Sequence, residues 1–295
     1  MKKFFLLFTL LFNFSLIAFS LAPPTQAVEV RMEFDSEGNL MIFANNKDYC
    51  EYYLAATLSD VKGYDVSRAN PYITTVRKGE SKILTLKRLS NSTSYSYNCT
   101  YMAYRGRVNP KLNMDFVYSL PVKPGDSVQA APEKSSGDFT LVFDLSFAGD
   151  TIYACREGRV CDDNLTDQTS KGNTVTKRII VNHKDESFSE YSYFEKALVY
   201  PGEYVKLGQP VAINTGKTFP KRVTFAVYYL DKNKVQNTET GSKYSHLVPV
   251  FHTLNAEDLK LEENTVYICE VNEHLITQEM SDREKKKYEK KKGKK

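Results

Sequence analysis

The chain has 295 residues, with 40 Lys and Arg against 36 Asp and Glu, and a formal net charge of +4 at pH 7. Removing the +6 of the last fifteen residues and the +2 of the two lysines near the start leaves −4 on the remainder. A mildly acidic folded part argues against nucleic-acid binding, which needs positive charge on the folded surface.

The first 27 residues have the organisation of an export signal. Lys2 and Lys3 precede an apolar run over residues 4–21, and Thr25-Gln26-Ala27 offers a small residue at a cleavage site. An uncleaved anchor is the alternative, because the run approaches the length of a membrane span, about 18–20 residues. The Pro-Pro break favours cleavage, so we expect an exported protein, periplasmic or at the cell surface.

Residues 28–120 are predicted to form an all-β module. Residues 28–34 alternate apolar and polar side chains, which places one face of a strand inward. Short strands at this spacing, without helical periodicity, predict an immunoglobulin-like β-sandwich. The further strands are expected over residues 40–44, 50–58, 72–76, 81–89 and 94–104.

The rest of the chain divides by composition. Residues 121–137 are rich in Pro, Gly, Ser and charge, which is typical of a linker. A β-rich block is expected over 138–230 and a C-terminal β extension over 231–280, with strands near 247–254 and 265–271. The Lys- and Glu-rich tail, 281–295, is expected to be a frayed helix or disordered.

The cysteines predict disulfides, because five of them occur in a chain expected to be exported. Cys50 and Cys99 lie in strand-like runs of the first module, and Cys155 and Cys161 flank a short strand and turn. We predict these two pairs, with Cys269 left over. The alternative is that all five are small buried hydrophobic residues.

Five short motifs lie in order between residues 149 and 216. Gly149–Val160 follows the pattern Gly-Thr-Pro-Val-x-Ala-x-x-x-Gly-x-Val, and Val205–Ala212 follows Val-Lys-x-Gly-Gln-x-Ile-Gly. The other motifs are Gly172-Asn173 with Ile179–His183, Phe188–Phe194, and Thr215-Gly216. Together they resemble the catalytic domain of the lysostaphin/LytM-type peptidoglycan endopeptidases, which has the duplicated hybrid motif fold. The resemblance implies a lysostaphin-like β domain over residues 138–230.

The resemblance also implies a zinc ion, held by a His and an Asp on one strand and a His near the domain end. A catalytic zinc needs three protein ligands and an open position for water. Thr140 stands at the first His position, although another alignment puts Val142 there. Asp144 stands at the Asp position and Thr224 at the last His position.

The two catalytic His positions of the family are also substituted, by Tyr193 and Arg222. Thr hydroxyls are poor zinc ligands and a lone carboxylate does not hold the ion. We therefore predict a degenerate member of the family without a zinc cofactor, and not an active enzyme. The four histidines show no metal-site spacing and are expected to be structural. They are His183, His246, His252 and His274.

A binding role survives the loss of zinc. Tyr191, Tyr193, Phe194, Arg222 and Phe225 are predicted to line the groove that the resemblance implies. Arginine suits the carboxylates of peptidoglycan stem peptides, and tyrosines suit sugars or peptides. The alternative is that Tyr193 and Arg222 only fill the vacated metal site, with Arg222 paired to Asp144.

Two classes of function follow. The first is a non-catalytic envelope protein that binds peptidoglycan or regulates a cell-wall hydrolase. The second is a structural subunit of an envelope assembly with a protein partner, and an active zinc endopeptidase ranks third. The lysine tail adds a contact with anionic wall polymers or lipid headgroups, unless it only aids solubility.

Overall fold

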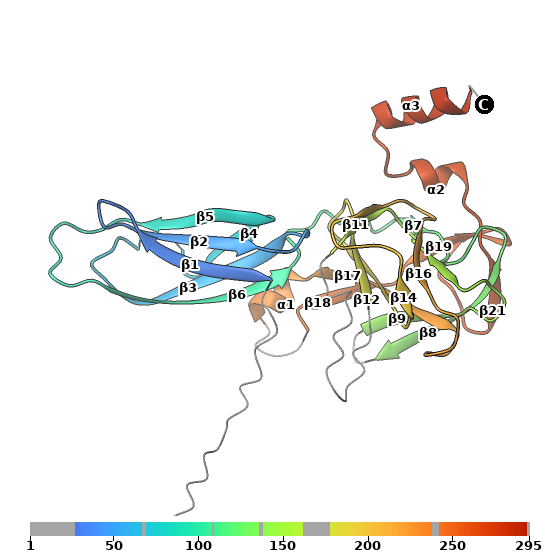
Figure 1. The fold of residues 1–295 in the computed structure, drawn as a ribbon, viewed down its shortest axis with the longest axis horizontal. Coiled ribbons are helices and arrows are strands. Elements are labelled where there is room, and N and C mark those ends of the chain that lie inside the picture. The colour runs from blue at the N-terminus through green and yellow to red at the C-terminus, as the bar shows by residue number, and fades with distance from the viewer. Residues whose placement is uncertain are drawn as a thin grey trace, which may run out of the picture.

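The computed structural model describes residues 27–66, 69–107, 109–135, 138–161, 178–237 and 242–293. The predicted export signal, apart from Ala27, and the Gly172-Asn173 motif lie outside the described residues. The described chain is mostly β, as predicted, and all but one of its strand pairings are antiparallel (Figure 1). No helix in these ranges is long and apolar enough to cross a membrane.

The N-terminal part contains two three-stranded antiparallel sheets, ordered β1-β2-β5 and β4-β3-β6. Apolar side chains of the two sheets meet in shared clusters, one of which joins Ala44 of β2 to Leu54 of β3. This two-layer packing agrees with a sandwich, and its immunoglobulin-like class stays a prediction. The strands are β1 Val28–Phe34, β2 Leu40–Asn46, β3 Tyr52–Lys62, β4 Tyr72–Val76, β5 Gly79–Leu86 and β6 Ser96–Arg105.

A nine-stranded sheet dominates the rest of the chain, in the order β15-β11-β12-β13-β17-β9-β8-β21, with β18 also paired to β17. One face of it packs into the largest core cluster, which includes Phe143, Phe225 and Phe251. Its strands are β8 Ser127–Ser135, β9 Asp138–Asp144, β11 Gly158–Val160, β12 Arg178–Asn182, β13 Phe188–Ser192, β15 Tyr204–Val205, β17 Arg222–Leu230, β18 Tyr244–Leu247 and β21 Thr265–Ile268.

Two small sheets and three helices complete the structure. The sheets are ordered β10-β16-β14 and β20-β19-β7. Their strands are β7 Val117–Tyr118, β10 Thr151–Tyr153, β14 Lys196–Ala197, β16 Pro210–Ile213, β19 Val250–Thr253 and β20 Ala256–Leu259, and the helices are α1 Lys232–Asn237, α2 Glu273–Thr277 and α3 Asp282–Lys292. The helical alternative for the tail is thus confirmed over α3, which begins at a capping box formed by Ser281 and Glu284.

The linker predicted over residues 121–137 is wrong where β8 lies. This strand pairs with β9 on one side and with β21 on the other, so it belongs to the central sheet. Val128 and Ala130 are fully buried. Val128 and Ala130 alternate along the strand and form its inward face. The Pro, Ser and charged residues around them gave the segment the composition of a linker.

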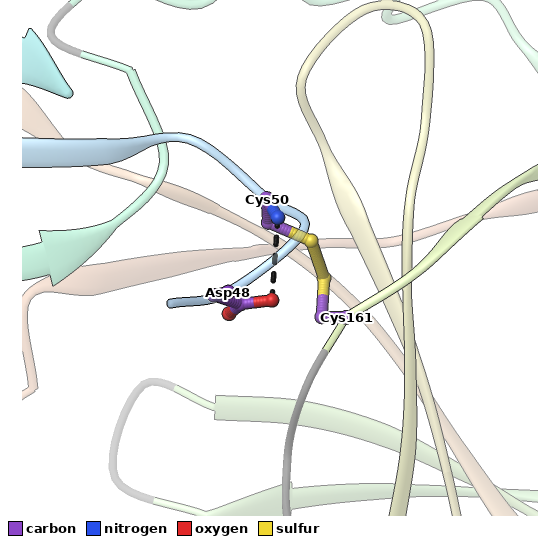
Figure 2. A group of neighbouring side chains, drawn as sticks. All are labelled: Asp48, Cys50 and Cys161. Carbon is purple, nitrogen blue, oxygen red and sulfur yellow. Dashed lines mark hydrogen bonds between the residues drawn. A yellow bond between two sulfur atoms is a disulfide. The ribbon is translucent and has the colours of Figure 1, made fainter. Parts of the chain in front are cut away.

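The disulfide joins the two parts of the chain. It links Cys50, which lies between β2 and β3, to Cys161 at the end of β11 (Figure 2). Cys99 and Cys155 are free, so the predicted Cys50–Cys99 and Cys155–Cys161 pairs are both wrong. Cys269, expected to be left over, is free and buried.

The position of each cysteine explains these errors. Cys99 lies in the middle of β6, opposite Leu58, and packs against the sandwich core. Cys50 lies instead at the end of the sandwich, in one cluster with Cys161, Ile180 and Phe188 of the central part. The pairing depends on how the two parts pack together, which strand periodicity within either part does not reveal.

Polar and steric contacts support the same interface. Tyr244 of β18 donates a hydrogen bond of 3.1 Å to the carbonyl oxygen of Arg105 at the end of β6. Gly106 has a φ of +121°, and a Cβ added there would lie 2.8 Å from Cβ of Leu230. The sandwich therefore packs closely against the end of β17 where Leu230 lies.

Replacing Cys50 with Ala is expected to lower the free energy of unfolding by about 2–5 kcal/mol, because the disulfide restricts the unfolded chain. Urea denaturation under non-reducing conditions measures this loss. Cys99→Ala removes a free thiol and is the control, which should change stability much less. Equal stability of the oxidised wild type and Cys50→Ala, or a Cys50–Cys99 peptide in a non-reducing digest, would contradict the assignment.

Candidate functional site

Three neighbouring strands bring most of the predicted site positions to one face of the central sheet. In the register of β17 with β9, Arg222 lies opposite Asp144 and Thr224 opposite Val142. Residues two apart on a strand share a face, so Thr140 points the same way as Asp144. We call this surface the open face and define it by Thr140, Val142, Asp144, Glu190, Ser192, Arg222, Thr224 and Ala226 of β9, β13 and β17.

The register explains why the aligned metal positions converge. Thr224 lies opposite Val142, the residue midway between Thr140 and Asp144, so it is the diagonal neighbour of both. Diagonal cross-strand neighbours lie about 7–8 Å apart at Cα, within the reach of long side chains. The side chains at these three positions are therefore close enough to contact one ligand. Their chemistry decides whether that ligand is a metal.

Their chemistry does not suit zinc. Thr140 and Thr224 offer neutral hydroxyls, and Asp144 is the one carboxylate of the three. In the part of the chain that the structure describes, one group of His, Cys, Asp or Glu could hold an ion, and it consists of Asp48, Cys50 and Cys161 (Figure 2). Both of its sulfur atoms are in the disulfide, so it offers no thiolate. Neither location fits a catalytic zinc.

Three residues predicted to line a groove are instead in the core. Tyr191, Phe194 and Phe225 are fully buried members of the main core cluster. Tyr191 lies opposite Phe225 in the register of β13 with β17, and their ring centroids are 5.2 Å apart. Tyr191 and Phe225 alternate with Ser192 and Thr224, so their side chains point to the opposite face of the sheet, and Phe194, after β13, is buried in the same core cluster. The groove prediction is wrong for all three.

Tyr193 and Arg222 do lie together at the end of the open face. Tyr193 follows β13 with a φ of +65°, a value that is uncommon for a residue other than glycine. The guanidinium carbon of Arg222 lies 5.3 Å from the centroid of the Tyr193 ring, a distance typical of a cation–π contact. The ring of Tyr193 also meets Phe219 edge-on at 6.1 Å.

A buried asparagine that the sequence analysis missed positions this pair. The side-chain amide of Asn214 donates to the carbonyl oxygens of Tyr193 and Arg222, at 2.9 Å each. Asn214 is fully buried and comes directly after β16. Its position before the Thr215-Gly216 motif is a signal that could have identified it, because an asparagine there can bond to nearby backbone.

A carboxylate beside this site has a structural role. Glu195 accepts hydrogen bonds from the hydroxyl of Thr215 and from the backbone amides of Thr215, Lys217 and Thr218. The Thr215 hydroxyl contributes most to these bonds, which lower the pKa of Glu195 to about 2. The carboxylate therefore stays charged and holds the 215–218 turn near Tyr193.

Arg222 and Asp144 do not form the ion pair expected if they merely filled the vacated site. Oδ1 of Asp144 accepts instead from the backbone amide and hydroxyl of Ser146, at 2.8 and 2.5 Å. The Nε atom of Arg222 is buried without a hydrogen-bond partner in the described ranges. A buried donor without a partner costs about 1–3 kcal/mol, so the surrounding residues do not satisfy the guanidinium.

His183 is bonded within the sheet region, as predicted. Its Nδ1 lies 2.8 Å from the carbonyl oxygen of Glu157 and its Nε2 lies 3.0 Å from the hydroxyl of Ser189. Burial, together with the positive charge of Arg156, lowers the pKa of His183 to about 3. The ring is therefore neutral and fixed at neutral pH.

Arg156 forms a buried charged cluster that sequence reasoning did not find. Its side chain is 1% exposed and pairs with both oxygens of Glu279, at 2.6 and 3.0 Å. It also lies 3.2 Å from Asp185 and stacks on the ring of Phe116. Glu279 follows α2, so this cluster fastens the C-terminal segment to the core.

Comparisons with known proteins give a distant likeness. No family model matches the sequence, and no curated protein matches it. Solved structures of M23 peptidases resemble it distantly over much of the chain. The M23 metalloprotease pseudoalterin from the deep sea is 16% identical, with a TM-score of 0.29 over 38% of this chain and 70% of that one.

Two further structures are similar at the same level. A zinc-containing peptidase from Vibrio cholerae is 13% identical, with a TM-score of 0.27 over 68% of this chain and 82% of that one. Helicobacter pylori Csd3 is 14% identical, with a TM-score of 0.28 over 74% and 75% of the two chains. Similarity this low does not transfer residue roles, so the site rests on its own geometry.

Substituting Leu for Arg156 is expected to lower the free energy of unfolding by about 3–5 kcal/mol, because it leaves two buried carboxylates without their cation. Urea denaturation measures the change. Lys206→Met, which removes an exposed partner of Glu157, is the control and should cost less than about 1 kcal/mol. If both variants were equally stable, Arg156 would not be the anchor described above.

Proposed function

We propose that this chain is an exported, non-catalytic protein of the cell envelope that binds peptidoglycan through the open face. The observation on which this rests is Arg222, whose side chain forms no hydrogen bond or ion pair with any other described residue. The cation lies half-buried at the end of the face, beside Tyr193. Such a cation suits a carboxylate, which it can hold with two parallel hydrogen bonds.

The ligand class follows from this cation and the predicted fold. The motifs that resemble the lysostaphin/LytM-type peptidases indicate a domain that recognises the stem peptides of peptidoglycan. These stem peptides end in carboxylates. The faces of Tyr193 and Phe219 next to Arg222 offer apolar contact for the atoms adjoining the carboxylate. A stem-peptide carboxylate paired with Arg222 is therefore the contact that we propose.

Binding is favoured over hydrolysis by the residues on the same face. A metallopeptidase needs a three-ligand metal site, whereas Thr140 and Thr224 are neutral and Asp144 bonds to Ser146. Export is supported by the disulfide, which is typical of oxidising compartments. A protein of this kind could also act on a wall hydrolase by occupying the substrate of that enzyme.

Arg222→Gln is expected to weaken binding to purified peptidoglycan sacculi about tenfold or more, because hydrogen bonds to charged groups are the stronger ones. Arg222→Lys should recover only part of the affinity, since an ammonium group lacks the planar fork. Co-sedimentation with sacculi over a range of protein concentrations measures both. Sacculi whose carboxyl groups have been converted to amides should bind the wild type as weakly as untreated sacculi bind Arg222→Gln.

Arg178→Gln is the matched control. Arg178 lies on β12, opposite Ser192, and is exposed on the same side of the sheet. Arg178→Gln and Arg222→Gln each remove one positive charge. Equal losses for both variants would indicate diffuse attraction and contradict recognition at Arg222. Wild-type protein that does not bind sacculi but purifies with a fixed protein partner would favour a structural subunit of an envelope assembly.

A further inference from the structure

A cavity of about 630 Å³ lies between α3 and the edge of the central sheet at β15. Its walls come from distant parts of the chain. One wall holds Lys184, from the turn between β12 and β13, and Tyr204 and Lys206 from β15 and the residue after it. The other wall is α3, which stands apart from the rest of the fold in Figure 1.

One side of α3 faces the cavity. Glu284, Lys287, Tyr288 and Lys291 all line it, and their spacing of three, four and seven residues places them on one side of a helix. Lys285 and Lys286 of the same helix do not line it. The helix thus presents some of its lysines to the cavity and turns others away.

The position of α3 is fixed by polar contacts, because the helix has no buried residue. Glu279, three residues before it begins, is held by Arg156. Ser281 and Glu284 cap its first turn, and Lys292 in its last turn forms an ion pair with Glu273 of α2. The helix that bounds the cavity is therefore held before its start by the buried Arg156–Glu279 pair and near its end by one exposed ion pair.

The cavity has an excess of free positive charge. Five lysines line it against three glutamates, and each glutamate already has a partner. Glu279 pairs with Arg156, Glu157 with Lys206 at 3.0 Å, and Glu284 accepts from the amide and hydroxyl of Ser281. In contrast, no ion pair or hydrogen bond joins the ammonium groups of Lys287, Lys290 and Lys291 to another residue in the described ranges.

We propose that this cavity binds a phosphate-bearing ligand. Lysines on opposing walls can surround a compact group with several anionic oxygens, and lysine binds phosphate as a point charge. The volume falls within the range of about 300–1,000 Å³ that holds small ligands, which suits a headgroup or a single sugar phosphate. The absence of an apolar side on α3 argues against insertion of this helix into a bilayer.

Isothermal titration of the full mature chain with inorganic pyrophosphate tests the proposal. The double variant Lys287→Gln/Lys291→Gln should bind at least about tenfold more weakly than the wild type, since charged hydrogen bonds are lost. The matched control is Lys285→Gln/Lys286→Gln, which removes the same charge from the same helix but from positions outside the cavity. The control should bind within twofold of the wild type, and circular dichroism should show the same fold for all three.

A second arm identifies the source of the phosphate. The same three proteins are sedimented with vesicles of phosphatidylglycerol in phosphatidylcholine. If Lys287→Gln/Lys291→Gln binds the vesicles more weakly than the wild type while the control variant does not, the ligand is a lipid headgroup. If the same difference is seen with pyrophosphate and not with vesicles, the ligand is a soluble phosphate. Equal losses in both double variants, or no binding of either probe by the wild type, would overturn the proposal.

Discussion

The register in which β17 pairs with β9 on one side and β13 on the other is the constraint on which the site depends. A slip of one residue would exchange the two faces of the sheet and move every side chain of β17 to the other side. In the observed register Phe225 and Tyr191 pack in the core, while Arg222 and Thr224 remain on the open face beside Asp144. The same pairing therefore stabilises the core and displays the proposed ligand-binding cation.

Strand periodicity predicted much of the fold. The alternation over residues 28–34 corresponds to β1, and the spacing of Arg222 and Thr224 places these two on one face of a strand, whereas Asp144 was grouped with them only by the family resemblance. The same rule should have excluded Phe225 from the groove, because it is an odd number of residues from Arg222. What periodicity could not supply was tertiary packing, as for the Cys50–Cys161 pair and the Arg156 cluster. Composition misled at β8, where small apolar residues are embedded in a linker-like stretch.

Two sets of contacts hold the sandwich and the C-terminal segment against the central part of the chain and leave two separate surfaces for ligands. The disulfide and the close contact at Gly106 hold the sandwich against the Leu230 end of β17, away from Arg222. The Arg156–Glu279 pair holds the C-terminal segment, and thereby α3, near the β15 edge of the sheet. One surface offers an arginine for carboxylates and the other offers lysines for phosphate, so the two can be altered independently.

The most direct test of a binding protein without metal chemistry combines two readings on the mature chain. Zinc is measured per mole of purified protein, and the protein is incubated with sacculi while soluble fragments are followed by mass spectrometry. We predict zinc well below one ion per chain, sedimentation with the sacculi, and no fragments beyond those of a buffer control. One zinc ion per chain, together with release of muropeptides that stops on chelation, would contradict this prediction.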